Sequence, residues 1–300
     1  MRARRVPEIK NRVYHDGQPI HRLGYLQVKL VLRGSRFTTS QDLRDFSRFV
    51  ARAARDANVG FDTEGHDGMR PRIREVLFLD TPDFLLYRNA YILRRRLEYQ
   101  DGFLVGDPEI VFKYRHSNVQ RAAEMDVRPQ LAGDYRVKFK AQALPLKHRV
   151  GAFRMLFSHN VEFPLSAVRQ VDRRSMATVL EVLPALRTLQ TTRARQIALV
   201  NNAAVEEILV KIGRLHFGKQ TGADASVALW RTRGDLQQLV GEFSFQIKLK
   251  RSAELPDKVA RRCEHFFIAL QRAASAWTSP GTTKTGVVYA LNGRVPRTHE

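Results

Sequence analysis

Three consecutive arginines, Arg94, Arg95 and Arg96, are the densest group of side chains in the sequence that could do chemistry. Apolar residues on either side, Ile92-Leu93 and Leu97, predict that they lie in a β-strand. Because side chains alternate across a strand, Arg94 and Arg96 share one face while Arg95 lies on the other. Two guanidinium groups on one face suit the binding of a phosphate-like anion; the alternative is a charged face covered by water.

The residues before this strand predict a second strand and a tight connection. Val76 and Phe78 supply its apolar positions, and Asp80-Thr81-Pro82-Asp83 is a dense cluster of turn-forming residues in which proline fixes the backbone. The sequence therefore predicts a strand, a turn, a short helical piece and the arginine strand between Arg74 and Glu98.

The same alternation recurs along the chain, so several strands have one apolar and one polar face. Their polar positions are Tyr25, Gln27 and Lys29; Lys113 and Arg115; Glu124 and Asp126; and Glu242, Ser244, Gln246, Lys248 and Lys250. Repeated strands of this kind fit a closed antiparallel β-barrel whose polar face points inward. Such an interior requires a polar ligand.

Two amphipathic helices are expected to pack on the outside of this barrel, which gives an α+β fold. Thr39 with Asp42 approximates a capping box, and an apolar stripe at helical spacing follows as far as Asp56. The second helix begins at Pro256 and has a similar stripe up to Trp277. The segment 60–72 has no periodicity and is predicted to be a surface loop.

The run FLDTPDFLLYRNAYILRRR resembles the signature of the CYTH superfamily, the triphosphate tunnel metalloenzymes. In that signature, a strand ending in D-T-P-D is followed by a short helical piece and an L-R-x-R strand. Lys29 falls where the lysine of the family's opening E-x-E-x-K strand belongs, and Lys113 falls where a basic strand residue is expected. D-T-P-D is the most specific of these elements.

Two further motifs follow in the family's order. Arg121, Glu124 and Asp126 resemble its R-x-x-E-x-E strand, and Thr283-Lys284 with Gly286 resembles its closing S-K-x-x-x-G segment. The resemblance extends over residues 23–291. It implies one barrel domain over residues 22–293 that includes the helix 256–277.

Members of this family hold a triphosphate with lysines and arginines, and bind with glutamates a divalent metal that directs water at the terminal phosphoryl group. The resemblance therefore implies phosphate-binding residues Lys29, Arg94, Arg96, Lys113, Arg115, Lys248 and Lys250. It also implies that Glu124, Asp126 and Glu242 bind Mg²⁺ or Mn²⁺.

The acidic part of the family pattern is incomplete. Tyr25 and Gln27 occupy the glutamate positions of the opening strand, while the cationic positions are retained. We therefore expect binding of triphosphate or polyphosphate with weak or absent metal-dependent hydrolysis. The alternatives are an active triphosphatase or adenylate cyclase-like enzyme, and a nucleic-acid-binding protein.

Composition agrees with an anionic partner, because the formal net charge of the 300 residues is +21. The segment 1–21 is basic and is expected to be a disordered arm, which could also contact nucleic acid, and residues 294–300 are expected to form a tail. A hydrophobic content of 43% is ample for a core. The single cysteine excludes an intramolecular disulfide. No apolar run reaches the length of a membrane span. The cytoplasm is therefore the expected location.

Overall fold

The computed structural model describes residue 9 and residues 12–65, 68–168, 175–189, 191–249 and 255–293. Its strands are β1 (Tyr25–Leu32), β2 (Gly60–Thr63), β3 (Pro71–Asp80), β4 (Tyr91–Gln100), β5 (Phe103–His116), β6 (Arg136–Leu146), β7 (Arg149–Pro164), β8 (Ala198–Gly218), β9 (Thr221–Thr232) and β10 (Gln238–Lys248). Its helices are α1 (Ser40–Asp56), α2 (Leu85–Arg88), α3 (Val119–Glu124), α4 (Met176–Val182), α5 (Asp257–Ala273) and α6 (Lys284–Tyr289).

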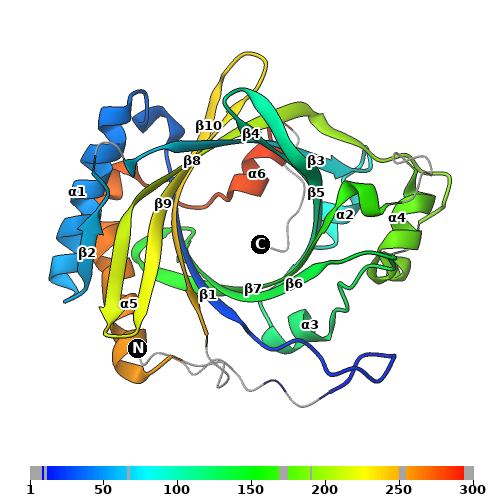
Figure 1. Ribbon diagram of the computed structural model, residues 1–300, viewed down its shortest axis with the longest axis horizontal. Coiled ribbons are helices and arrows are strands. Elements are labelled where there is room, and N and C mark those ends of the chain that lie inside the picture. The colour runs from blue at the N-terminus through cyan, green and yellow to red at the C-terminus, as the bar shows by residue number, and fades with distance from the viewer. Residues whose placement is uncertain are drawn as a thin grey trace.

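Every one of these strands except β2 belongs to one closed barrel. The order around the ring is β8-β3-β4-β5-β7-β6-β1-β10-β9, and β9 pairs again with β8 (Figure 1). The predicted closed barrel with helices outside is therefore confirmed. One pair differs from the expected antiparallel pattern, because β1 and β6 run parallel. No hairpin joins these two strands, so no short turn forces them to be antiparallel.

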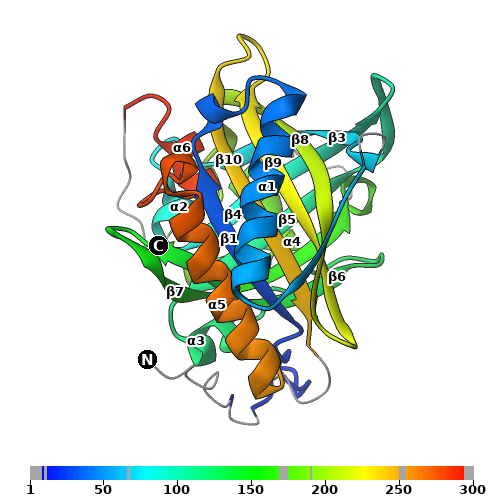
Figure 2. The same cartoon turned by 90° about the vertical axis from the view of Figure 1, so that its left-hand side faces the viewer.

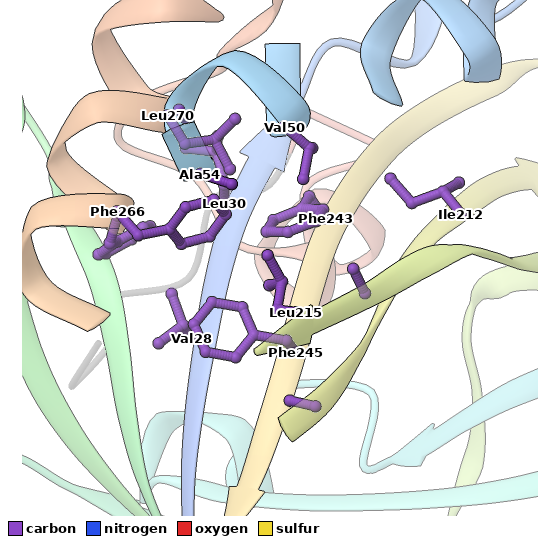
Figure 3. Close-up of a cluster of buried hydrophobic side chains, with 14 of the residues drawn as sticks. Val28, Leu30, Val50, Ala54, Ile212, Leu215, Phe243, Phe245, Phe266 and Leu270 are labelled. Atoms are coloured by element: carbon purple, nitrogen blue, oxygen red, sulfur yellow. The ribbon is translucent and has the colours of Figure 1, made fainter. Parts of the chain in front are cut away.

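Helices α1 and α5 lie side by side on the outside of the barrel, over β1, β10 and β9 (Figure 2). Thr39 and Asp42 form the expected capping box at the start of α1. Beneath the two helices, the outward side chains of β1 and β10 meet the helical stripes in one buried cluster that includes Val28, Phe243 and Phe266 (Figure 3). Since Val28 and Leu30 face this outer layer, Lys29 between them faces the interior.

Helix α6 lies within the outline of the ring in Figure 1 and covers one end of the barrel. Val288 and Tyr289 of α6 pack against the inward side chains Phe78 and Trp230 in a buried cluster. Tyr289 also stacks on Tyr87 of α2, with ring centroids 4.0 Å apart. Apolar side chains therefore pack between α6 and the barrel wall, although Lys284 at the start of α6 also contacts buried carboxylates of the wall.

The D-T-P-D turn provides the anchor for both α2 and α6. Asp80 is almost fully buried, and its carboxylate accepts hydrogen bonds from the backbone N–H groups of Leu86 and Tyr87, both at 2.9 Å. The same carboxylate accepts a hydrogen bond from the hydroxyl of Tyr289 at 3.0 Å. This aspartate has a structural role, because its carboxylate holds α2, α6 and the N–H of Thr81 in the turn.

Three expectations about local structure were wrong. Residues 119–124 form helix α3 and not a strand, because Asn118 caps it by accepting a hydrogen bond from the Arg121 N–H and Ala122 and Ala123 are buried. The predicted loop 60–72 contains β2 and the start of β3. Part of the expected disordered arm is packed, since Tyr14 is 5% exposed.

Some expectations concern residues outside the described ranges. They include Lys250, the tail 294–300 and most of residues 1–11. No helix in the described part of the chain is both long and apolar enough to cross a membrane.

Candidate anion-binding site

The inward faces of adjacent strands carry rows of cationic side chains. Arg94 and Arg96 lie on the inward face of β4, because Leu93 packs against α4 residues in an outer apolar cluster. Phe112 of β5 belongs to the same outer cluster, which places Lys113 and Arg115 on the inward face. Lys29 on β1 completes the part of the predicted phosphate-binding set that the barrel brings together.

The third arginine of the run points the other way. Arg95 lines a cavity on the outside of the barrel together with Ile110 of β5 and Val179 of α4. The predicted alternation of Arg94, Arg95 and Arg96 is therefore observed in the side chains. Arg95 lies next to the candidate site in sequence but is separated from it by the barrel wall.

Two members of the predicted set are not among the buried cations that the structure describes. Lys248 is exposed at the end of β10, and Lys250 lies outside the described residues. Lys29, Lys113 and Arg115, by contrast, are 9%, 5% and 8% exposed. Arg94 and Arg96 are half-buried.

Several inward residues were not among the predicted site residues. Lys138 and Lys140 on β6 continue the cationic row, and Arg136 precedes them. Glu162 of β7 accepts salt bridges from Lys138 at 2.6 Å and from Arg136 at 3.0 Å. The alternation of residues 135–140 was a visible signal for this strand, but the position of Glu162 opposite it depends on the pairing of β6 with β7.

Part of the interior charge is neutralised within the protein. Arg96 forms a salt bridge with Glu109 at 3.0 Å. Burial alone would raise the pKa of Glu162, but the charges of Lys138 and Arg96 hold it at about 2. Glu162 is therefore ionised and serves as a partner of Lys138 and Arg136.

Lys113 and Arg94 form the uncompensated part of the site. Neither has a salt-bridge partner among the described residues, and the Arg94 Nε is buried without a hydrogen bond to any of them. Burial lowers the pKa of Lys113 well below its ordinary value, and so do the nearby charges of Arg94, Arg115, Lys29 and Lys140. Burial, followed by Arg96, lowers the pKa of Arg94 to about 9.

The pKa values of two other lysines are lowered in the same way. Burial lowers the pKa of Lys29 to about 8, although Glu242 opposes the shift. Burial, Lys138 and Lys29 lower the pKa of Lys140 to about 7. Burial is the largest cause of each shift and the neighbouring cations add to it, so a bound polyanion would favour the protonated lysines.

The predicted metal ligands are not brought together. Glu124 ends α3, which lies outside the ring in Figure 1, and forms a salt bridge with Arg12. Asp126 also lies outside the barrel interior, where its carboxylate pairs with Arg128 at 2.6 Å. Glu242 does face the interior, but the Nζ atoms of Lys29 and Lys284 lie 3.5 Å and 3.2 Å from its Oε1.

A divalent cation does not fit this donor set. Mg²⁺ and Mn²⁺ need oxygen ligands that are not already neutralised, and the carboxylate nearest to Glu242, that of Glu207, is 3.0 Å from the same Lys284 ammonium. Among the described residues, no three or more His, Cys, Asp or Glu side chains gather as a possible metal site. The arrangement can bind an anion, and we derive no step through a metal.

No protein-family model and no curated protein sequence matches the chain. Among solved structures, it is similar to an adenylyl cyclase candidate from Hippeastrum with a dominant triphosphatase activity, with a TM-score of 0.42, 11% identity and coverage of 91% of this chain and 98% of that chain. An adenylate cyclase candidate from Bacillus halodurans has a TM-score of 0.36 and 12% identity, with 87% and 97% coverage.

These TM-scores are below 0.5, so we draw no functional conclusion from them. The closed barrel and the D-T-P-D turn at the end of β3, followed by the inward Arg94 and Arg96, come from the chain itself. They are the features in which the sequence resembles the CYTH superfamily.

Proposed function

We propose that the protein binds triphosphate or polyphosphate inside the barrel, and that its metal-dependent hydrolysis is weak or absent. The observation that carries the proposal is the pair of inward cations Lys113 and Arg94, which have no carboxylate partner within salt-bridge distance among the described residues. Two unit charges 4 Å apart repel by about 4 kcal/mol at an effective dielectric constant of about 20, so a bound anion relieves this repulsion.

The shape of the cationic set favours a chain of phosphates over a single one. Lys29, Lys113 and Lys140 come from β1, β5 and β6, and Arg94 comes from β4, so the charges are distributed around the inner wall. A linear polyanion can contact several of them at once, whereas one phosphate contacts few. Arginine supplies paired N–H donors that match phosphate oxygens, and lysine supplies a point charge.

The direct test is thermal unfolding with tripolyphosphate in the presence of EDTA. Ligand at 100 times its dissociation constant should add about 2.7 kcal/mol to the free energy of unfolding. A melting temperature that does not change at saturating tripolyphosphate would refute the proposal.

Adjacent arginines supply a matched pair of variants. Arg94→Gln removes an inward charge and should weaken tripolyphosphate binding by about tenfold or more, since a hydrogen bond to a charged group contributes about 1.5–3 kcal/mol. Arg95→Gln makes the same chemical change on the outer face and should leave the dissociation constant unchanged. Equal losses in the two variants would show that the anion does not bind inside the barrel.

A further inference from the structure

A buried chain of alternating charges joins α6 to the barrel wall. The Nζ atom of Lys284 lies 3.0 Å from Glu207 Oε1 and 3.2 Å from Glu242 Oε1, so one ammonium bridges two carboxylates. Glu207 is 7% exposed and Glu242 is 5% exposed. The ammonium also lies 4.6 Å from the centre of the Trp230 ring, whose N–H donates to Glu207 Oε1 at 2.8 Å.

Both carboxylates are ionised despite their burial. Burial alone would raise the pKa of each, but Lys284 is the largest opposing influence on both, and the pKa values lie below their ordinary range. Glu207 belongs to β8 and Glu242 to β10, on either side of β9, which carries Trp230. Two charged carboxylates that reach one cation from strands on either side of β9 are the arrangement that a bridging divalent metal would otherwise complete.

Helix α6 fixes the ammonium in this position. Lys284 is the first residue of α6, and the Thr283 hydroxyl caps the helix by accepting a hydrogen bond from the Gly286 N–H at 3.0 Å. At the other end, the Asn201 side chain donates to the Val288 carbonyl at 2.8 Å. The lysine is therefore held by a helix that is itself bonded at both ends.

We infer that Lys284 takes the place of a bridging metal ion and that the protein selects the metal-free form of its polyphosphate. The inference rests on the proposed function, because it concerns the form of anion that the barrel accepts. Lys29 links the two groups of charges, since it lies 3.5 Å from Glu242 Oε1 and its pKa is influenced by Lys284, Arg115 and Arg94. A metal ion carried in on the phosphate chain would meet these cations and be repelled.

The first experiment needs no variant. Tripolyphosphate affinity is measured by calorimetry in EDTA and again in Mg²⁺ at a concentration that converts the ligand to its magnesium complex. The inference predicts that Mg²⁺ weakens binding by about tenfold or more, because the complex has less negative charge to pair with the cations. Equal or tighter binding in Mg²⁺ would overturn the inference and leave the proposed function intact, whereas no binding in either condition would refute the proposed function.

The second experiment tests the triad without any phosphate. Lys284→Gln removes the bridging charge and leaves Glu207 and Glu242 side by side, so Mn²⁺ alone should raise the melting temperature of this variant, with little shift in the wild type. Lys258→Gln is the control, since Lys258 is exposed on α5 and loses the same charge. A Mn²⁺ shift in the wild type or in the control as large as that in Lys284→Gln would overturn the inference.

If the Lys284→Gln variant fails to fold, Lys284→Met is used in its place, because methionine keeps the length and apolar stem of the side chain. The Mn²⁺ shift is expected in this variant too. If a folded variant lacking the ammonium shows no Mn²⁺ shift, the two carboxylates do not form a latent metal site and the inference fails.

Discussion

Lys140 is the inward residue whose charge state is most sensitive to conditions near neutral pH. Its Nζ donates a hydrogen bond to Gln246 Oε1 at 2.9 Å and lies 5.6 Å from the centre of the Tyr25 ring, so its direct contacts are with neutral groups. With its pKa lowered to about 7 by burial and then by Lys138 and Lys29, a substantial fraction is neutral in the free protein at pH 7–8. An anion bound beside Lys140 favours the protonated form of this lysine.

Polyphosphate binding should therefore take up protons. The protonated form binds the anion, so affinity should increase as the pH falls from about 9 through the lowered pKa values of Lys29 and Lys140, about 8 and 7, and should level off below pH 6. Calorimetry at pH 8 in buffers of different ionisation enthalpy measures this proton uptake. The ligand is a long polyphosphate, because its internal phosphates stay ionised. Lys140→Gln should take up fewer protons than the wild type, and proton release by the wild type would contradict this account.

The arginine run shows which parts of the site can be predicted from sequence. The opposite directions of Arg94 and Arg95 depend only on the period-two geometry of a strand, which is a local property. The carboxylates near these arginines depend on strand pairing. Glu109 lies on the adjoining β5, whereas Glu207 reaches the interior on β8, far from β4 in sequence. For that reason the sequence predicts that Arg94 and Arg96 share a face, whereas most of the carboxylates that face the interior were missed.

At the scale of elements, the D-T-P-D turn joins β3, α2 and α6 through one carboxylate. Burial raises the pKa of Asp80 to about 6, although the N–H groups of Leu86 and Tyr87 favour the charged form. Tyr289 supplies the bond that reaches across from α6. The turn is therefore a junction between three elements.

A double-mutant cycle tests this junction. Asp80→Asn and Tyr289→Phe each remove part of a buried hydrogen-bond network, and each should lower the free energy of unfolding by about 1–3 kcal/mol in urea titrations. Because the two residues contact each other, the double variant should lose less than the sum of the single losses, with a coupling of about 0.5–3 kcal/mol. Strictly additive losses would mean that the bond between Asp80 and Tyr289 contributes nothing to stability.

The misassigned element was α3. The R-x-x-E-x-E spacing from Arg121 to Asp126 matched a family strand, but the same residues also read as a helix, with Asn118 as cap and Ala122-Ala123 as strong helix formers. Tertiary packing decided between them, since Ala122 and Ala123 are fully buried against the barrel's outer wall. The family spacing alone was too short to exclude the helix.

Across the whole molecule, the lowered lysine pKa values make stability depend on pH. Between about pH 7 and 9, Lys29 and Lys140 bind fewer protons in the folded state than in the unfolded chain, where a lysine pKa is about 10.4. Stability without ligand should therefore rise with pH over this window, by about 1–3 kcal/mol from these groups. Urea titrations at pH 7 and 9 measure the change, and saturating polyphosphate should flatten it or reverse its sign.

The N-terminal segment allows the barrel site to be separated from general attraction to polyanions. Removing residues 1–11 lowers the positive charge of the chain but leaves the inward cations in place. We expect tripolyphosphate affinity to stay within about twofold, while binding to single-stranded nucleic acid, which depends steeply on salt, decreases. Loss of all polyanion binding in the truncated protein would assign the binding to the segment and not to the barrel.

The position of β1 in the ring has a consequence for how the chain folds. β1 pairs with β6 on one side and with β10 on the other, so the first strand synthesised completes its pairing only with the last. Loop closure over such separations is slow, and barrels dominated by non-local contacts fold more slowly than proteins of local topology. Until β10 is made, the open edges of β1 and β9 are exposed to other chains, and a nascent protein stopped before β10 presents two unpaired edges that favour aggregation.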